Sequence, residues 1–108
     1  MTAKELAEAL SLNIVTLPDP EAEVQSGYVG DMPSWVMGYA TEGSAWVTIL
    51  NNRNIVAVAV LLEMACVIVT EGAEVSEEVA AVAKDRNVNL FSTTESSFRT
   101  VARMAELL

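Results

Sequence analysis

Two apolar runs, residues 44–50 and 65–70, have the composition of buried strands, and the segment between them limits the folds open to the chain. That segment, NNRNIVAVAVLLEM, spans residues 51–64. Its alternating Val and Ala fit a second strand in a hairpin that turns at residues 51–54, or a helix capped by Asn51 or Asn52 that reaches Met64. Two parallel buried strands need a connection of about a dozen residues. We therefore expect the helix, and the three pieces predict a right-handed β-α-β unit.

The same alternation of helix and strand patterns extends over the whole chain. Helices are expected at residues 2–10, after Asp31, after Ser76 and from Thr93 or Thr94 onward, and further strands at residues 13–16, 24–30 and 88–92. The order αββαβαβαβα predicts an α/β fold with a mostly parallel β-sheet sandwiched by helices. With 108 residues and no linker, residues 1–108 are expected to form one domain.

Helical spacing also predicts which side chains the core receives. Asp31 is a good N-cap for the second helix, with Pro33 in its first turn. The apolar stripe expected to dock that helix is Met32, Trp35, Val36, Tyr39 and Ala40. The inner side of the last helix is expected to carry Phe98, Val101, Ala102 and Ala105. Trp35 and Trp46 are expected to anchor the core.

The chain is acidic, with 15 Asp and Glu against 6 Lys and Arg and a net charge of −9. This balance opposes binding to nucleic acid and to anionic membranes, since both depend on basic residues. No apolar run is long enough to span a bilayer, and residues 1–10 do not resemble a secretory leader, so we expect a cytoplasmic protein. A hydrophobic share of 52% suggests that some apolar surface is buried between subunits, which favours a homodimer.

The catalytic side chains of most familiar hydrolases are absent. The chain has no histidine, which excludes Ser-His and Cys-His pairs and imidazole metal sites. It has no phosphate-binding loop, because the GYVG segment lacks both the spacing and a nearby lysine. The one cysteine, Cys66, lies in the apolar run ACVIVT and is expected to be a small core residue. We expect no enzyme activity, no metal and no cofactor.

Small polar residues follow three successive predicted strands. In open parallel sheets, ligands bind beyond the carboxyl ends of the strands, and helix N-termini there attract anions. Two hypotheses remain for these residues, namely a site for a small anion or nucleotide phosphate and ordinary helix caps. The candidate ligand-binding residues are Asn51, Arg53, Asn54, Thr70, Gly72, Thr93, Thr94 and Ser97.

A Gly-rich stretch, EVQSGYVGDMPSWVMGYA at residues 23–40, raises the question of a second ligand-binding loop. Gly27 and Gly30 are expected to permit a bulged strand and a sharp entry into the following helix. This motif loop comprises Ser26, Gly27, Tyr28, Gly30 and Asp31.

Three blocks carry a family resemblance: GYVGD-x-x-S-W-V-M, N-I-V-A-V-A-V and S-T-x-x-S-S-F. Together they resemble the DRTGG-domain family, which is similar to the N-terminal domain of HPr serine kinase/phosphorylase. The resemblance covers nearly the whole chain and implies the α/β fold of the HPr kinase N-terminal domain. It is strongest to the small stand-alone versions of the family. The family's namesake motif is eroded, since only Gly27 stands as expected. The positions of its acid, arginine, threonine and first glycine hold Glu21, Ala22, Gln25 and Ser26.

The resemblance implies a regulatory and dimer-forming module. Our first hypothesis is a homodimeric, non-catalytic ligand sensor that binds a nucleotide or small phosphorylated metabolite. The alternative is an accessory subunit that docks onto a redox enzyme without a small-molecule ligand, because stand-alone relatives are often encoded beside iron-only hydrogenase subunits. A third hypothesis, an enzyme that uses Cys66 or carboxylates, has the least support.

Overall fold

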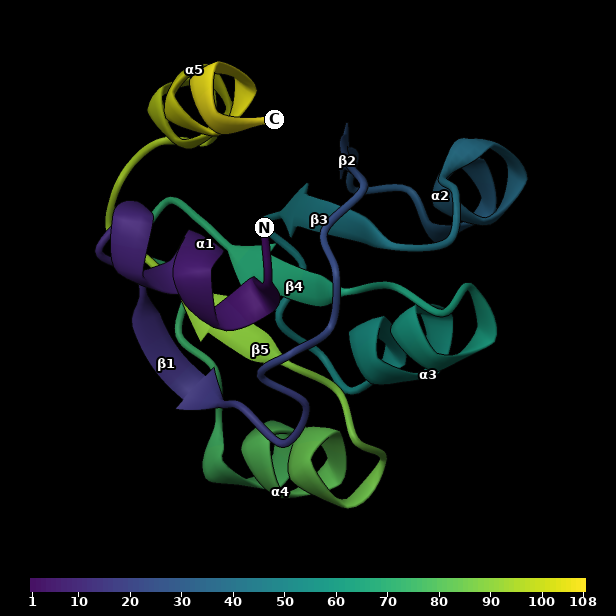
Figure 1. Cartoon of the computed structure of the whole chain (residues 1–108). Coiled ribbons are helices and arrows are strands. Elements are labelled where there is room, and N and C mark those ends of the chain that lie inside the picture. The colour runs from purple at the N-terminus through teal and green to yellow at the C-terminus, as the bar shows by residue number, and fades with distance from the viewer.

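The computed structural model describes residues 1–108 and shows a five-stranded sheet with helices on both faces (Figure 1). The strands lie in the order β1-β5-β4-β3-β2. Strands β2 to β5 are parallel, and β1 runs antiparallel to β5 at the edge of the sheet. The predicted fold class, a mostly parallel α/β sheet covered by helices, is confirmed.

The ten elements also follow the predicted order. They are α1 (Ala3–Ala9), β1 (Asn13–Thr16), β2 (Ser26–Val29), α2 (Pro33–Tyr39), β3 (Ser44–Thr48), α3 (Asn54–Leu61), β4 (Cys66–Val69), α4 (Glu77–Asp85), β5 (Leu90–Ser92) and α5 (Ser97–Leu107). None of the helices is both long and apolar enough to cross a bilayer.

Helix α3 provides the crossover between β3 and β4. These strands pair in parallel from Ala45 with Cys66 to Thr48 with Val69, so the hairpin alternative is excluded. Both strands are buried along their whole length. The crossover helix buries Ile55, Val56, Val58 and Ala59, which explains why an almost continuous apolar run forms a helix here.

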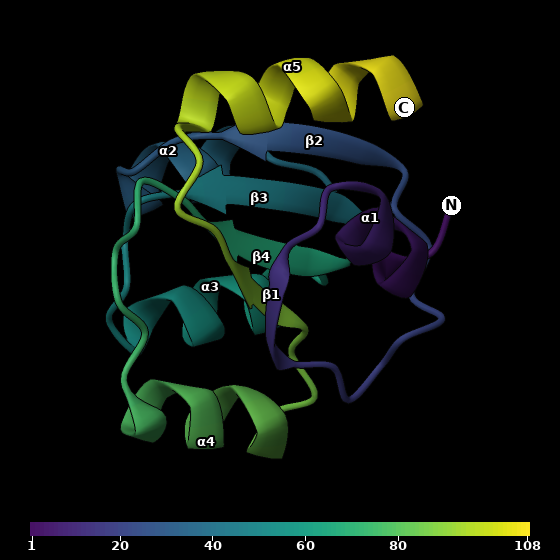
Figure 2. The same ribbon diagram turned by 90° about the vertical axis from the view of Figure 1, so that its left-hand side faces the viewer.

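The sheet divides the hydrophobic core into two layers. Helices α1 and α5 cover one face and pack on Ala45, Ile68 and Phe91. Helices α2, α3 and α4 cover the other face, where Trp46 and Val67 are fully buried. Figure 2 shows α5 lying along β2, with α3 and α4 on the opposite side of the sheet.

Helix caps were predicted correctly where the cap residue is local and unambiguous. Thr2 and Glu5 form the expected capping box of α1, in which the Thr2 N–H donates to Glu5 Oε1 at 2.8 Å. That hydrogen bond lowers the pKa of the Glu5 carboxyl. Ser76 caps α4 by accepting from the Val79 N–H.

Two other helix starts were placed wrongly. Helix α3 begins after Arg53, and the Asn52 side chain instead accepts from the Asn54 N–H, so neither predicted asparagine is the N-cap. Helix α5 begins later than expected, because Ser96 is its cap. Thr93 instead stabilises the turn before the helix, where its hydroxyl accepts a hydrogen bond from the Glu95 N–H.

Asp31 was predicted to cap α2 and does not. Its carboxylate accepts two hydrogen bonds from the adjacent strand end, from Thr48 Oγ1 and from Ile49 N, each at 2.9 Å. Helix α2 starts after Met32 without a side-chain cap. Asp31 therefore ties the end of β2 to the end of β3.

The bulge expected in β2 is also absent, since Ser26–Val29 pair with β3 in unbroken register. Gly27 serves close packing instead. A Cβ atom at this position would lie 2.5 Å from Cε of Met104, so the missing side chain makes room for the end of that side chain.

Two predicted apolar stripes do not face the core. In α2 only Val36 is buried, while Trp35 and Tyr39 are 56% and 64% exposed and stack on each other with ring centroids 5.0 Å apart. In α5 the buried residues are Thr100 and Met104. Val101 is partly buried, whereas Phe98 is 83% exposed and Ala102 and Ala105 are also exposed. Trp46 is thus a core anchor, and Trp35 is not.

The two tryptophans give a matched test of this core. Trp46→Phe removes the indole donor that bonds the Gly30 carbonyl at 2.8 Å, which should cost about 1–3 kcal/mol of the free energy of unfolding. Trp35→Phe, on the surface, should change it by less than about 0.5 kcal/mol. Urea unfolding of both variants measures the difference, and equal losses would contradict the assignment of Trp46 alone to the core.

Candidate functional site

The carboxyl edge of the sheet collects the predicted ligand-binding residues from three successive strand ends. Asn51, Arg53 and Asn54 follow β3, Thr70 and Gly72 follow β4, and Thr93, Thr94 and Ser97 follow β5. Since β3, β4 and β5 are parallel neighbours, these three loops lie beside one another. The structure therefore brings the candidate residues to one edge, and their individual contacts divide them into separate groups.

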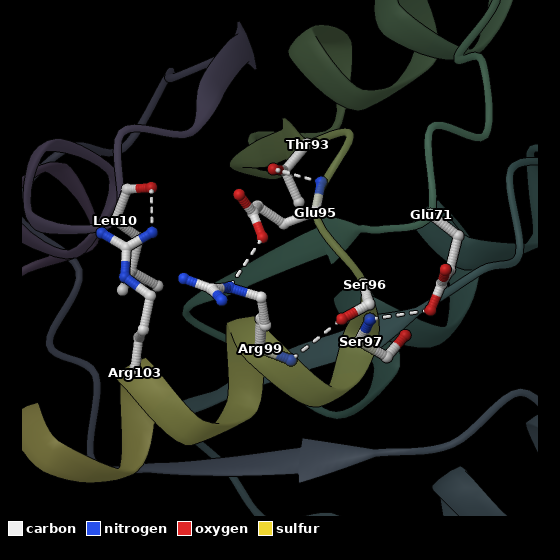
Figure 3. Close-up of polar contacts among 8 residues, drawn as sticks. All are labelled: Leu10, Glu71, Thr93, Glu95, Ser96, Ser97, Arg99 and Arg103. Atoms are coloured by element: carbon white, nitrogen blue, oxygen red, sulfur yellow. Dashed lines mark hydrogen bonds and ion pairs between the residues drawn. The ribbon is translucent and has the colours of Figure 1, made fainter.

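The first group holds the start of α5 against the end of β4 (Figure 3). The hydroxyls of Thr70 and Ser97 lie 2.6 Å apart. The Ser97 N–H donates to Glu71 Oε2 at 2.8 Å, and the Glu71 N–H donates to the Glu95 carbonyl at 2.9 Å. A carboxylate of the chain itself therefore occupies the position that an anion would take at the N-terminus of α5.

The middle of α5 carries two further polar contacts drawn in Figure 3. Arg99 Nε lies 3.2 Å from Glu95 Oε2. Arg103 reaches α1 and donates to the carbonyls of Ala9 and Leu10, where a cation complements the negative end of the helix dipole. The Arg103 contacts tie α5 to the end of α1, whereas the Arg99–Glu95 pair is local to the start of α5.

The second group surrounds the loop after β3. The Asn51 amide donates to the Glu74 carbonyl at 2.8 Å, which joins this loop to the segment before α4. Arg53 forms an ion pair with Glu78 at 3.3 Å, and both side chains are largely exposed. Such a pair contributes at most about 1 kcal/mol, so the Arg53 guanidinium can exchange its partner at little cost.

The third group lines a cavity of about 400 Å³ at the same edge. Gly72, Thr93 and Thr94 contribute to its wall. Gly72 has a φ of 72°, and its N–H donates to the Thr93 carbonyl at 3.0 Å, so the two loops are joined directly at the cavity. The remaining lining residues are Asn13, Val15, Ala73, Glu74, Val75 and Ser92.

Of the polar lining residues that the sequence did not predict, Glu74 lies in the loop after β4, whereas Asn13 and Ser92 belong to β1 and β5. Asn13 begins β1, and its amide donates to Ser92 Oγ at 3.0 Å across the antiparallel pair. Their contribution follows from the position of β1 beside β5, which no local pattern in the sequence indicates. The cavity wall thus offers amide and hydroxyl groups, with Glu74 as its only charged residue.

The motif loop lies away from this cavity. It belongs to β2 and the turn after it, which β3 and β4 separate from β5. Ser26 Oγ lies 3.4 Å from the hydroxyls of Thr41 and Ser44, and the Gly30 carbonyl and the Asp31 carboxylate bond to β3 or its end. The contacts found for these residues fasten the edge strand to its neighbour.

A second cavity of about 410 Å³ lies at the amino ends of the strands. Its lining includes Asp19, Glu23, Glu42 and Glu63, with Arg86 as its one basic residue. This concentration of carboxylates disfavours an anionic ligand. No group of three or more His, Cys, Asp or Glu side chains lies close enough to hold a metal ion, and no buried side-chain polar atom lacks a partner.

Cys66 lies in β4 and is fully buried, as the sequence predicted. Burial raises the pKa of its thiol from 9.0 to about 12, because the thiolate would lose its hydration. At neutral pH the thiol is therefore protonated and inaccessible. Both properties oppose a role as a nucleophile.

The buried thiol makes two measurements predictable. A thiol reagent should label Cys66 slowly in the folded protein and rapidly in urea. The pKa of the Cys66 thiol is higher in the folded than in the unfolded protein. The contribution of the buried thiol to the free energy of unfolding is therefore complete below pH 9. It is lost as pH rises from 9 toward 12, by up to about 1.4 kcal/mol per pH unit. Cys66→Ala should show a shallower loss over that window. Rapid labelling of the folded protein would contradict this assignment.

Comparisons with known proteins agree with the fold and identify a family. The family model of the DRTGG domain matches residues 5–107. A comparison with curated protein sequences gives no match. Among solved structures, the CBS and DRTGG domains of the regulatory region of Clostridium perfringens pyrophosphatase, complexed with the activator diadenosine tetraphosphate, superpose with a TM-score of 0.75 at 20% sequence identity. The match covers 99% of this chain and 47% of that one, so this chain spans about half the length of its structural neighbour. From the family match over nearly its whole length, the chain belongs to the DRTGG domain family.

Proposed function

We propose that this chain is a non-catalytic regulatory module, acting as a homodimer, that senses a nucleotide or small phosphorylated metabolite at the carboxyl edge of its sheet. The observation that carries the proposal is the cavity of about 400 Å³ at that edge, lined by Gly72, Thr93 and Thr94. Ligands of open parallel sheets bind at this edge. The structural neighbour supports the ligand class, because it is a regulatory region complexed with a dinucleotide activator.

The electrostatics of the cavity determine how such a ligand would lie. With Glu74 in the wall and no basic residue, the cavity favours an uncharged polar group, such as a base or a ribose, bonded to Asn13, Ser92 or Thr94. The phosphates would remain outside. Arg53 is the cation in the adjoining loop, which Asn51 holds against Glu74, and a phosphate would replace Glu78 as its partner.

Thermal unfolding in the presence of millimolar AMP, ADP, ATP, diadenosine tetraphosphate or adenosine tests this proposal. A ligand that binds only the folded state should raise the melting temperature, with a stabilisation of about 2.7 kcal/mol at a concentration 100 times its Kd. Thr94→Leu, which fills the cavity from an exposed position, should abolish the shift. Arg53→Gln should weaken only the phosphorylated ligands.

The control is Ser34→Leu, another exposed hydroxyl residue, in α2 and outside the cavity lining. It should bind like the unmodified protein. The absence of a shift with all five compounds would refute the sensing of adenine nucleotides, and equal loss in both leucine variants would refute the assigned cavity.

A second candidate function is docking onto a redox enzyme of the iron-only hydrogenase type. The exposed stack of Trp35 on Tyr39 favours it, since aromatic side chains are enriched at the centres of protein interfaces. Co-expression with the subunits of an iron-only hydrogenase should yield an iron-containing complex, and Trp35→Glu should lose it. Ile14→Glu, at the opposite edge of the sheet, is the control. Equal recovery of the complex with Trp35→Glu would exclude α2 as the docking surface.

A further inference from the structure

We propose that the homodimer forms through α5 and the free edge of β2, which pairs antiparallel with β2 of a second copy. The inference rests on the homodimer proposed above and names its surface. We call this surface the α5–β2 strip, formed by Gly27, Val29, Phe98, Val101, Ala105 and Leu108.

The first argument is an apolar stripe that the folded chain leaves largely unused. Phe98, Val101, Ala105 and Leu108 recur at spacings of three, four and three residues, which places them on one side of α5. The core takes Thr100 and Met104 from this helix instead. Phe98 remains 83% exposed, and Leu108 is exposed as well. The helix therefore turns Thr100 and Met104 to the core and leaves much of its apolar stripe, above all Phe98, in solvent.

The second argument is the state of the two sheet edges. Strand β2 pairs with β3 on one side in unbroken register and has no strand on its other side. Strand β1, at the opposite edge, carries a register irregularity between Ile14 and Thr16, which disfavours further pairing. The regular edge of β2 has unpaired backbone groups available for another strand.

The strip is continuous with this edge. Two hollows of about 330 and 190 Å³ run between α5 and β2, and Val29, Val101 and Ala105 line both. The larger hollow is bordered by Phe98 and the smaller by Gly27 and Leu108. A strand added beside β2 would bring apolar side chains over these hollows, as in edge-strand recognition elsewhere.

A second copy fits the strip because it brings the same regular β2 edge and the same apolar stripe, and the strip carries no charge that would oppose it. The chain has a net charge of −9, so two copies repel wherever their carboxylates face each other. The strip contains no charged residue, and the nearby Arg99 and Arg103 are already engaged with Glu95 and with α1. A basic partner would find no carboxylate to pair with on the strip itself. The strip is therefore suited to a partner with the same charge and the same apolar stripe.

Two-fold symmetry then sets the geometry. In a dimer the same patch of each subunit meets its copy, and a strand that pairs with itself about a two-fold axis does so antiparallel. The two sheets would join into one sheet of ten strands, with the two α5 helices on the same face. A stable interface of standard size buries about 800 Å² per partner, about a seventh of the 5715 Å² surface of this chain. Because the paired edge is only four residues long, we expect a dimer that dissociates at micromolar concentration.

Sedimentation equilibrium between 1 and 200 µM tests the surface. The unmodified protein should be dimeric at the upper concentrations. Phe98→Glu and Val29→Glu place carboxylates in the strip and should each raise the dimer Kd by about tenfold or more. Leu61→Glu is the matched control, because Leu61 is 69% exposed but lies on α3, on the other face of the sheet. The dimer Kd of this variant should equal that of the unmodified protein.

Circular dichroism and thermal unfolding establish that the variants are folded. A monomeric unmodified protein at 200 µM overturns the inference and leaves the strip to another protein. A dimer that persists in both strip variants, or is lost equally in Leu61→Glu, also overturns it. The ligand-induced thermal shift of the monomeric variants is read separately, so failure of this surface is distinguishable from failure of ligand sensing.

Discussion

The parallel pairing of two fully buried strands, β3 and β4, is the constraint on which the rest of the structure depends. Because neither face of this pair can meet water, helices must cover both faces, and the connection between the strands must be one of these helices. Repetition of the same connection through α4 places β5 in parallel as well. The carboxyl ends of the strands then lie along one edge, and the loops that follow them form the cavity there. The position of the candidate site is thus a consequence of how the core is buried.

The opposite end of the strand order has a different consequence. Strand β2 lies at the edge of the sheet and is fastened to β3 by side-chain hydrogen bonds. Asp31 accepts from the end of β3, and the Trp46 indole donates to the Gly30 carbonyl. These bonds lie on the inner side of β2 and leave its outer side unpaired. Gly27 makes room for the end of the Met104 side chain, which packs from α5 onto this strand. Gly27 therefore has a packing role that does not require a ligand.

The sequence predicted element order, fold class and the edge that carries the candidate residues, because apolar runs and crossover length determine them. It failed where a side chain has several partners to choose from. Asp31 has the chemistry of an N-cap. In the folded chain its carboxylate instead accepts two hydrogen bonds from the end of β3, which makes that strand end the better partner. Trp35 and Phe98 follow helical spacing as regularly as core residues do, and periodicity alone cannot distinguish a core from an unpartnered surface. Asn13 joins the cavity only because β1 pairs antiparallel with β5, a long-range contact without a local signal.

Both proposed surfaces meet at the segment between β5 and α5. Thr93 and Thr94 border the cavity, while Ser97 begins the helix that carries the apolar stripe, and Thr70 and Glu71 hold Ser97 in place. A ligand that prefers one arrangement of this segment would also favour one position of α5 and hence one state of the dimer. Linkage then requires the reverse effect of equal size, so dimerisation would change ligand affinity by the same factor. The hydrogen bonds that join Ser97 to Thr70 and Glu71 are the contacts through which such a coupling would pass.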